Sequence, residues 1–127
     1  MERNTQQRQA ILKAFERAER PLGVQEVLDL AQEDCPGLGI ATIYRNLKAL
    51  VSDRKLVSID MPGGVSFYEL SGGHHHHHFA CTSCQRVFDV EKCGINVKNL
   101  VPEGFTLQRH EVLLFGLCNT CTESIGN

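Results

Sequence analysis

The sequence predicts an α+β fold: an N-terminal winged helix-turn-helix domain, then a small α/β dimerisation domain with a four-cysteine zinc site. Three observations support this prediction. The first half contains three amphipathic helical segments followed by a hairpin signal, which is the element order of a winged helix. The second half contains short β-rich runs. Two C-x-x-C pairs lie within that second half.

The composition sets limits on the class of protein. The 127 residues are 42% hydrophobic and 22% charged, with a net charge of -2, which is ordinary for a globular protein. No apolar run approaches the roughly 20 residues of a membrane span, so we expect no membrane partner. The polar start predicts a cytoplasmic protein, where thiols stay reduced and paired cysteines favour metals over disulfides. Any DNA binding must come from a local cluster on a helix, because the net charge excludes a broad basic surface.

Two helical segments come first. The apolar residues Ile11, Leu12, Phe15 and Ala18 have helical spacing and predict a helix over residues 5–18, started by a cap at residue 4 or 5. Pro21 and Gly23 end it. A second apolar stripe predicts the next helix, which the turn at residues 34–37 ends; the stripe consists of Val24, Val27, Leu28 and Ala31.

The third helical segment, Gly39 to Asp53, is the expected recognition helix. Its apolar stripe leaves Tyr44, Arg45 and Lys48 on the other faces, with Thr42 at or beside the N-cap. Two β-rich runs follow, at residues 56–60 and 65–70, joined through two glycines that suit a tight turn. This hairpin is the expected wing, and the helix is expected to enter the major groove of DNA. These four side chains are our candidate DNA contacts.

The second domain begins after a hinge. We place the DNA-binding domain at residues 1–71, the hinge at about 70–73 and the second domain at 74–127. Strands are expected at residues 76–80, 86–90 and 105–115, with a short helix around Val97. The unit is too small for a large core, and its apolar strand faces suit pairing with a second copy of the chain.

The cysteine pairs carry the strongest chemical signal. The pairs are Cys81 with Cys84 and Cys118 with Cys121, and each follows a β-rich run. Four thiolates from two such turns make the closed tetrahedral site that structural Zn²⁺ prefers. A redox dithiol and an iron–sulfur cluster are the alternatives, but two symmetric pairs in one small domain favour zinc.

A run of histidines precedes the first cysteine pair. Because side chains alternate along a strand, His76 and His78 face one way and His75 and His77 the other, so one strand can supply two metal sites. Polar loop and purification tag are the alternative interpretations. Other possible ligands each also have an ordinary structural explanation; they are Glu69, Asp89, Cys93 and His110.

Together these motifs resemble the ferric uptake regulator family. The resemblance rests on the segment at residues 39–47 (GIATIYRNL), the histidine run leading into the first cysteine pair, and the segment at residues 116–121 (GLCNTC). It extends over nearly the whole chain. It implies a homodimer that binds double-stranded DNA at an AT-rich inverted repeat and represses transcription when a regulatory metal is bound. Tyr44 and Arg45 match the family's base-contacting pair, and Arg8 matches a basic residue that contacts phosphate.

The same resemblance implies three metal sites. The four paired cysteines match the structural zinc site. The regulatory site matches Glu69, His76, His78 and Asp89. That site in the family also includes a histidine before the second helix, where this chain has Arg20-Pro21. A second family site matches His75, His77 and His110, and Cys93 stands where most members have a glutamate.

This departure at Cys93 favours zinc sensing, because a thiolate with imidazoles suits Zn²⁺ better than Fe²⁺ or Mn²⁺. The missing histidine weighs against the ferrous-iron and peroxide branches of the family, which are the alternatives within this fold. From other classes, we considered a zinc hydrolase and a metal buffer. The sequence has no clear nucleophile or base for hydrolysis, and a buffer would leave the recognition helix unexplained. We therefore expect a regulator with no enzymatic activity and no small-molecule substrate.

Overall fold

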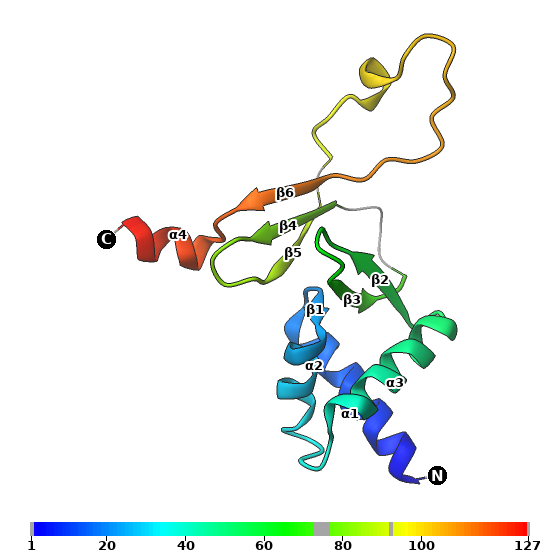
Figure 1. Ribbon diagram of the computed structural model, residues 1–127, viewed down its shortest axis with the longest axis vertical. Helices are drawn as coiled ribbons and strands as arrows, with labels where there is room; N and C mark the ends of the chain where they lie inside the picture. The colour runs from blue at the N-terminus through cyan, green and yellow to red at the C-terminus, as the bar shows by residue number, and fades with distance from the viewer. Residues whose placement is uncertain (1, 73–76, 92, 127) are drawn as a thin grey trace. The chain divides into compact units, whose positions relative to one another are not determined.

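The computed structural model describes residues 2–72, 77–91 and 93–126, and the chain forms two compact units, residues 1–73 and 74–127 (Figure 1). Each unit has its own sheet. No helix in the described part of the chain is long and apolar enough to cross a membrane.

Three helices form the core of the N-terminal unit: α1 (Glu2–Ala18), α2 (Val24–Ala31) and α3 (Ile40–Ser52). Their apolar stripes face one another and are fully buried. Ile11 of α1, Val27 of α2 and Ile43 of α3 each have an exposed fraction of 0%. Burial of these stripes explains why three short helices are stable together, since isolated helices of this length are marginal in water.

The wing of this unit is a three-stranded sheet in the order β1-β3-β2. Its strands are β1 (Leu22–Gly23), β2 (Leu56–Asp60) and β3 (Ser66–Leu70). The predicted hairpin joins β2 and β3, with Ser58 opposite Tyr68. Gly63 and Gly64 have φ angles of 90° and 81°, which glycine adopts without strain. The two-residue strand β1, which was not predicted, pairs with β3 and closes the sheet over the helices.

The C-terminal unit has a sheet in the order β5-β4-β6. The strand β4 (His77–Cys81) pairs antiparallel with β5 (Val87–Val90) and parallel with β6 (Leu113–Gly116). A long segment between β5 and β6 contains the 3-10 helix η1 (Val97–Leu100) and extends away from the sheet (Figure 1). The helix α4 (Asn119–Gly126) ends the chain.

Two predicted boundaries were wrong, and one helix was missed. The strand expected over residues 105–115 forms only at Leu113–Gly116, because the residues before it have no partner strand within the described residues and Phe105 is 71% exposed. The first helix begins at Glu2, before the expected cap. The helix α4 was not predicted, since its sequence lacks an apolar stripe of any length.

Candidate metal centres and nucleic-acid interface

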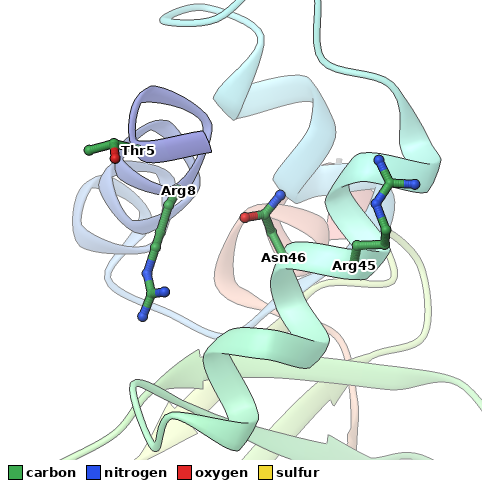
Figure 2. A pocket seen from close by; sticks show the side chains of 4 residues that line it. All are labelled: Thr5, Arg8, Arg45 and Asn46. Atoms are coloured by element: carbon green, nitrogen blue, oxygen red, sulfur yellow. The ribbon is translucent and has the colours of Figure 1, made fainter. Parts of the chain in front are cut away.

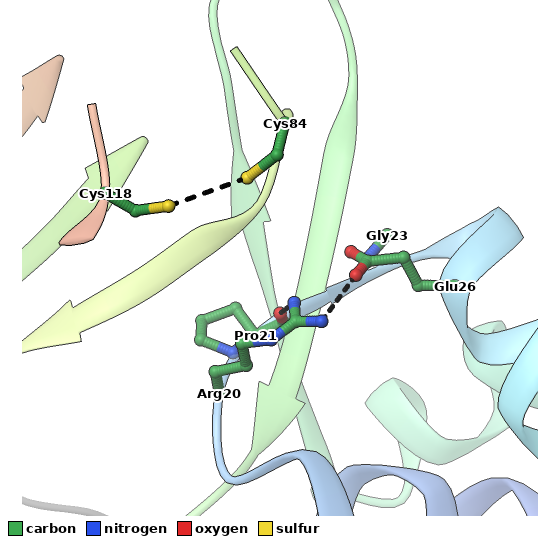
Figure 3. A network of polar contacts seen from close by, with 6 residues as sticks. All are labelled: Arg20, Pro21, Gly23, Glu26, Cys84 and Cys118. Carbon is green, nitrogen blue, oxygen red and sulfur yellow. Dashed lines mark hydrogen bonds and ion pairs between the residues drawn. The ribbon is translucent and has the colours of Figure 1, made fainter. Parts of the chain in front are cut away.

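The four paired cysteines converge at one end of the C-terminal sheet. Cys81 ends β4 and lies opposite Gly116 of the parallel strand β6, so both pairs leave the sheet at the same edge. The four sulfur atoms all lie within 4.8 Å of one another. The sulfurs of Cys84 and Cys118 are 3.9 Å apart (Figure 3). A tetrahedral zinc ion with Zn–S distances of about 2.3 Å needs sulfurs about 3.8 Å apart, so these residues fit a four-thiolate zinc site.

The local hydrogen bonds prepare this cluster for a cation. The backbone N–H groups of Cys84 and Cys118 donate to the sulfur of Cys81 at 3.5 and 3.4 Å. These donors, Cys84 first, lower the pKa of Cys81 to about 6. For Cys121 the largest effect, a hydrogen bond with Ser83, lowers the pKa, but the neighbouring thiols and burial outweigh it and raise the pKa to about 11. The cluster thus favours ionisation of Cys81 and disfavours ionisation of Cys121. A bound metal ion would offset the negative charge of the additional thiolates.

A second group of candidate ligands lies on one face of β4. The sulfur of Cys93 is 3.4 Å from Nε2 of His110, and the ring of His110 lies 5.0 Å from the ring of His77, centroid to centroid. One ligand atom from each of the three residues lies within 4.8 Å of the others. His77 is buried, whereas Cys93 is exposed. One thiol and two imidazoles are a donor set that zinc accepts.

The hydrogen bond of His77 bears on how it would bind a metal. The backbone N–H of Val112 donates to Nδ1 of His77 at 3.0 Å. The neutral ring then carries its proton on Nε2, the nitrogen that would have to bind the ion. Ligation through Nε2 therefore requires that the proton move to Nδ1 and that the Val112 contact break. Cys93 would bind as a thiolate, so its proton also has to leave when a metal binds.

His78 projects from β4 toward a different partner. It lies opposite Asp89 in the sheet register, and its Nε2 is 3.5 Å from a carboxylate oxygen of Asp89. Both side chains are partly buried. Glu69, the other predicted ligand of this set, lies on β3 in the N-terminal unit. His75 and His76 lie outside the described residues.

Arg20 lies where the family resemblance led us to expect a histidine, at Arg20-Pro21. Its guanidinium donates to Glu26 at 2.7 Å and to the carbonyl of Pro21 at 3.2 Å (Figure 3). Glu26 in turn accepts the N–H of Gly23 at 3.3 Å, which is half of a capping box at the start of α2. A guanidinium offers donors and no acceptor, so Arg20 cannot bind a metal ion.

The exposed face of α3 carries the predicted DNA contacts. Tyr44 is 56% exposed, and Arg45 donates to the hydroxyl of Thr42 at 3.0 Å. A mostly apolar pocket of about 410 Å³ separates α3 from the wing. Its lining includes Tyr44, Arg45 and Lys48 from α3 and also Ser58 and Tyr68 from the wing. The sequence did not single out these two wing residues, because strand alternation alone does not say which helix residues they face.

A second pocket, of about 370 Å³, lies between α1 and α3 and is lined by Thr5, Arg8, Arg45 and Asn46 (Figure 2). Arg8 forms an ion pair with Asp53 at 2.9 Å. Asn46 donates to the carbonyl of Thr42 at 2.9 Å, one turn earlier on α3. Of these residues, Thr5, Asn46 and Asp53 were not among the predicted DNA contacts.

A winged-helix unit together with a unit that gathers thiols and imidazoles defines a class: DNA-binding regulators that respond to a metal. The chain belongs to the ferric uptake regulator family, whose model matches residues 2–115. It is 31% identical over 124 residues to the ferric uptake regulation protein of Bacillus subtilis (strain 168), covering 92% of this chain and 83% of that protein.

Two solved structures extend the comparison. The ferric uptake regulator from Francisella tularensis, solved with iron, has a TM-score of 0.74 and 27% identity, with 92% of each chain covered. FurB from M. tuberculosis, a zinc uptake regulator, has a TM-score of 0.53 and 30% identity, with 94% of this chain and 95% of that chain covered. Both sequence and fold therefore confirm a metal-responsive transcriptional regulator, and proteins of this family are dimeric and are not enzymes. The relatives differ in metal, so family membership alone does not select one.

Proposed function

We propose that this protein is a zinc-responsive repressor that binds an AT-rich inverted repeat in double-stranded DNA as a homodimer. The observation that carries the choice of zinc is the contact between Cys93 and His110, at 3.4 Å. A thiolate beside imidazoles is a softer ligand set than the carboxylate and imidazole ligands that suit Fe²⁺ and Mn²⁺. Arg20 supports the same choice, since it removes one nitrogen ligand from the other site.

The regulatory site in this proposal consists of Glu69, His76, His78 and Asp89. The contact of His78 with Asp89 supports it, because a carboxylate beside an imidazole is half of the proposed ligand set. When Glu69 of the N-terminal unit shares one ion with the three ligands of the C-terminal unit, the hinge at about 70–73 has one orientation. In that orientation the two DNA-binding units of the dimer match two half-sites of the DNA. The gain in DNA affinity equals at most the ion's preference for this orientation over the others.

Exposed apolar side chains of the C-terminal unit support a dimer built on this unit. Leu114 and Phe115 on β6 are 45% and 58% exposed, and Phe105 in the preceding segment is 71% exposed. Large side chains left exposed in one small unit indicate a surface that a second copy covers.

DNA binding under metal control tests the proposal. The purified protein, with its four-cysteine zinc retained, is titrated with buffered free Zn²⁺, Fe²⁺ or Mn²⁺ against a duplex that carries an AT-rich inverted repeat, at fixed salt. We expect zinc to switch on binding at a far lower free concentration than the other two ions. Activation by iron or manganese at equal or lower concentration would assign the chain to the iron or peroxide branch. DNA binding that no metal alters would overturn metal regulation.

A further inference from the structure

We propose that the pocket between α1 and α3 receives a backbone phosphate of the bound DNA, and that Asp53 is a positioning residue that holds Arg8 in place for it. This inference rests on the proposed function, because it concerns how the same DNA is bound. The family resemblance already implies a phosphate contact for Arg8. The new elements are the pocket that receives the phosphate and the function of Asp53, an acidic residue that sequence reasoning did not single out.

The lining of the pocket suits an anion. Two guanidinium groups, from Arg8 and Arg45, and two neutral polar side chains, Thr5 and Asn46, surround a volume of about 370 Å³ (Figure 2). No carboxylate belongs to the lining formed by the described residues. A guanidinium carries five N–H donors in a planar fork that matches a phosphate. Because Arg45 lies on the expected recognition helix, an anion in this pocket belongs to the DNA that α3 contacts.

Asp53 lies just beyond α3 and reaches α1 through Arg8. One oxygen of its carboxylate accepts from Nη2 of Arg8 at 2.9 Å, across 45 residues of sequence. The guanidinium has further donors that this one contact does not use. Arg8 can therefore keep its bond to Asp53 and donate to a phosphate at the same time, and the ion pair limits how far its long side chain moves.

Two physical arguments indicate that Asp53 acts through Arg8. The residue is the C-cap of α3, where the helix dipole disfavours a carboxylate. It also carries negative charge beside a surface that approaches phosphates. An asparagine at this position would avoid both costs but could not form the ion pair that the carboxylate makes with Arg8. Holding the Arg8 guanidinium beside the pocket is the contribution of this ion pair.

A double-mutant cycle on DNA binding tests the inference. The full-length, metal-loaded dimer is titrated with the duplex defined above, for Asp53→Asn, Arg8→Ala and the double variant. We expect Asp53→Asn alone to weaken binding about three- to five-fold, an effect in the range of an exposed ion pair. In the Arg8→Ala background the same change should weaken nothing, and it should strengthen binding as a repulsive charge is lost. Arg8→Ala should also reduce the slope of log affinity against log salt by about 0.9, as expected for one phosphate contact.

Asp34→Asn is the matched control, because Asp34 pairs with Arg17 of the same helix α1 and the change in charge is identical. Asp53→Glu should keep most of the affinity, since it keeps the charge. Equal weakening by Asp53→Asn with and without Arg8 would show damage to α3 and overturn the inference. Stronger binding by the Asp53→Asn variant that retains Arg8 would show that the carboxylate only repels the DNA, and this would overturn the inference as well. A wild-type dimer that does not bind DNA would instead contradict the proposed function itself.

Neutral methylphosphonates locate the phosphate. Each duplex carries one methylphosphonate, moved stepwise along the backbone, which removes a single charge from the DNA. One position in each half-site should weaken binding by the wild-type dimer more than binding by the Arg8→Ala dimer, in which only Arg45 remains to meet the charge. If every position weakens both proteins equally, no phosphate lies in this pocket.

Discussion

The sulfur of Cys93 lies 3.4 Å from Nε2 of His110, although 17 residues separate the two in the chain. The contact joins the two ends of the long segment between β5 and β6. His77 of β4 lies beside them, so the segment returns to the sheet at a place that already presents an imidazole. A metal shared by these three residues would fix the segment to the sheet.

The first prediction concerns Cys93 and the choice of metal. Cys93→Ser replaces the thiolate with a poor ligand. The free Zn²⁺ concentration for half-maximal DNA binding should therefore rise about tenfold or more, because the loss of even a residue that only supports a ligand lowers metal affinity by about that factor. The response to Fe²⁺ should change less. Cys35→Ser, a cysteine in the N-terminal core, is the control. A Cys93→Ser protein with unchanged zinc response and an equal iron response would contradict zinc sensing.

The second prediction concerns the four-cysteine site and pH. Cys121→Ser should remove tightly held zinc from the purified protein and destabilise the C-terminal unit, measured by metal content and thermal unfolding. In the wild-type protein the raised pKa of Cys121, about 11, means that zinc must displace its proton at every lower pH. The lowered pKa of Cys81, about 6, means that this thiol is already ionised at pH 8. Zinc affinity should therefore fall as pH falls, and it should fall more steeply once the pH drops below about 6.

The third prediction separates two kinds of DNA contact on α3. Tyr44→Ala should reduce binding to the operator-like duplex and leave binding to mixed-sequence DNA nearly unchanged, because an aromatic ring contacts base edges. Lys48→Ala should weaken both duplexes alike and reduce the salt dependence, as expected for a phosphate contact. Competition binding at several salt concentrations measures both effects. Identical behaviour of the two variants would show that Tyr44 does not read sequence.

Sequence patterns predicted the elements that bury an apolar stripe. The three helices and the hairpin of the N-terminal unit formed because Ile11, Val27 and Ile43 must be removed from water together. The cysteine pairs could also be recognised from the sequence, since the spacing within each pair is typical of zinc ligands. The strand β1 has only two residues, Leu22 and Gly23, and its position depends on pairing with β3 far along the chain.

Sequence patterns likewise predicted only part of the candidate sites. Strand alternation predicted that neighbouring histidines point to different partners, and His77 and His78 have different neighbours in the structure. The pairing of Arg8 with Asp53 could not be predicted, because it requires the packing of α1 on α3. The segment from Phe105 to Val112 was misread as a strand because its residues favour β structure, yet Phe105 and Leu107 remain exposed in the single chain.

The fourth prediction tests whether the two units are stabilised independently. Leu47→Ala removes a side chain that is 1% exposed in the N-terminal core, and such changes cost about 2–5 kcal/mol. DNA binding should be lost at a lower temperature, while zinc content of the C-terminal unit stays unchanged. Leu114→Ala on β6, where the side chain is 45% exposed, should leave the N-terminal unit stable and weaken the dimer instead. Loss of zinc in Leu47→Ala would show that the units unfold together.

The last prediction concerns Arg20, which lies at the position where the family resemblance implies a histidine. Arg20→His replaces a cation that repels metal ions with an imidazole that can bind one. We expect the free Fe²⁺ or Mn²⁺ concentration for half-maximal DNA binding to fall about tenfold, toward that for Zn²⁺. The variant also loses the 2.7 Å contact with Glu26, so its thermal stability is measured alongside. Arg17→His, in the last turn of α1, is the control for exchanging an ion-paired arginine for an imidazole. If Arg20→His loses stability but its iron response does not change, then the missing histidine does not decide which metal this protein senses.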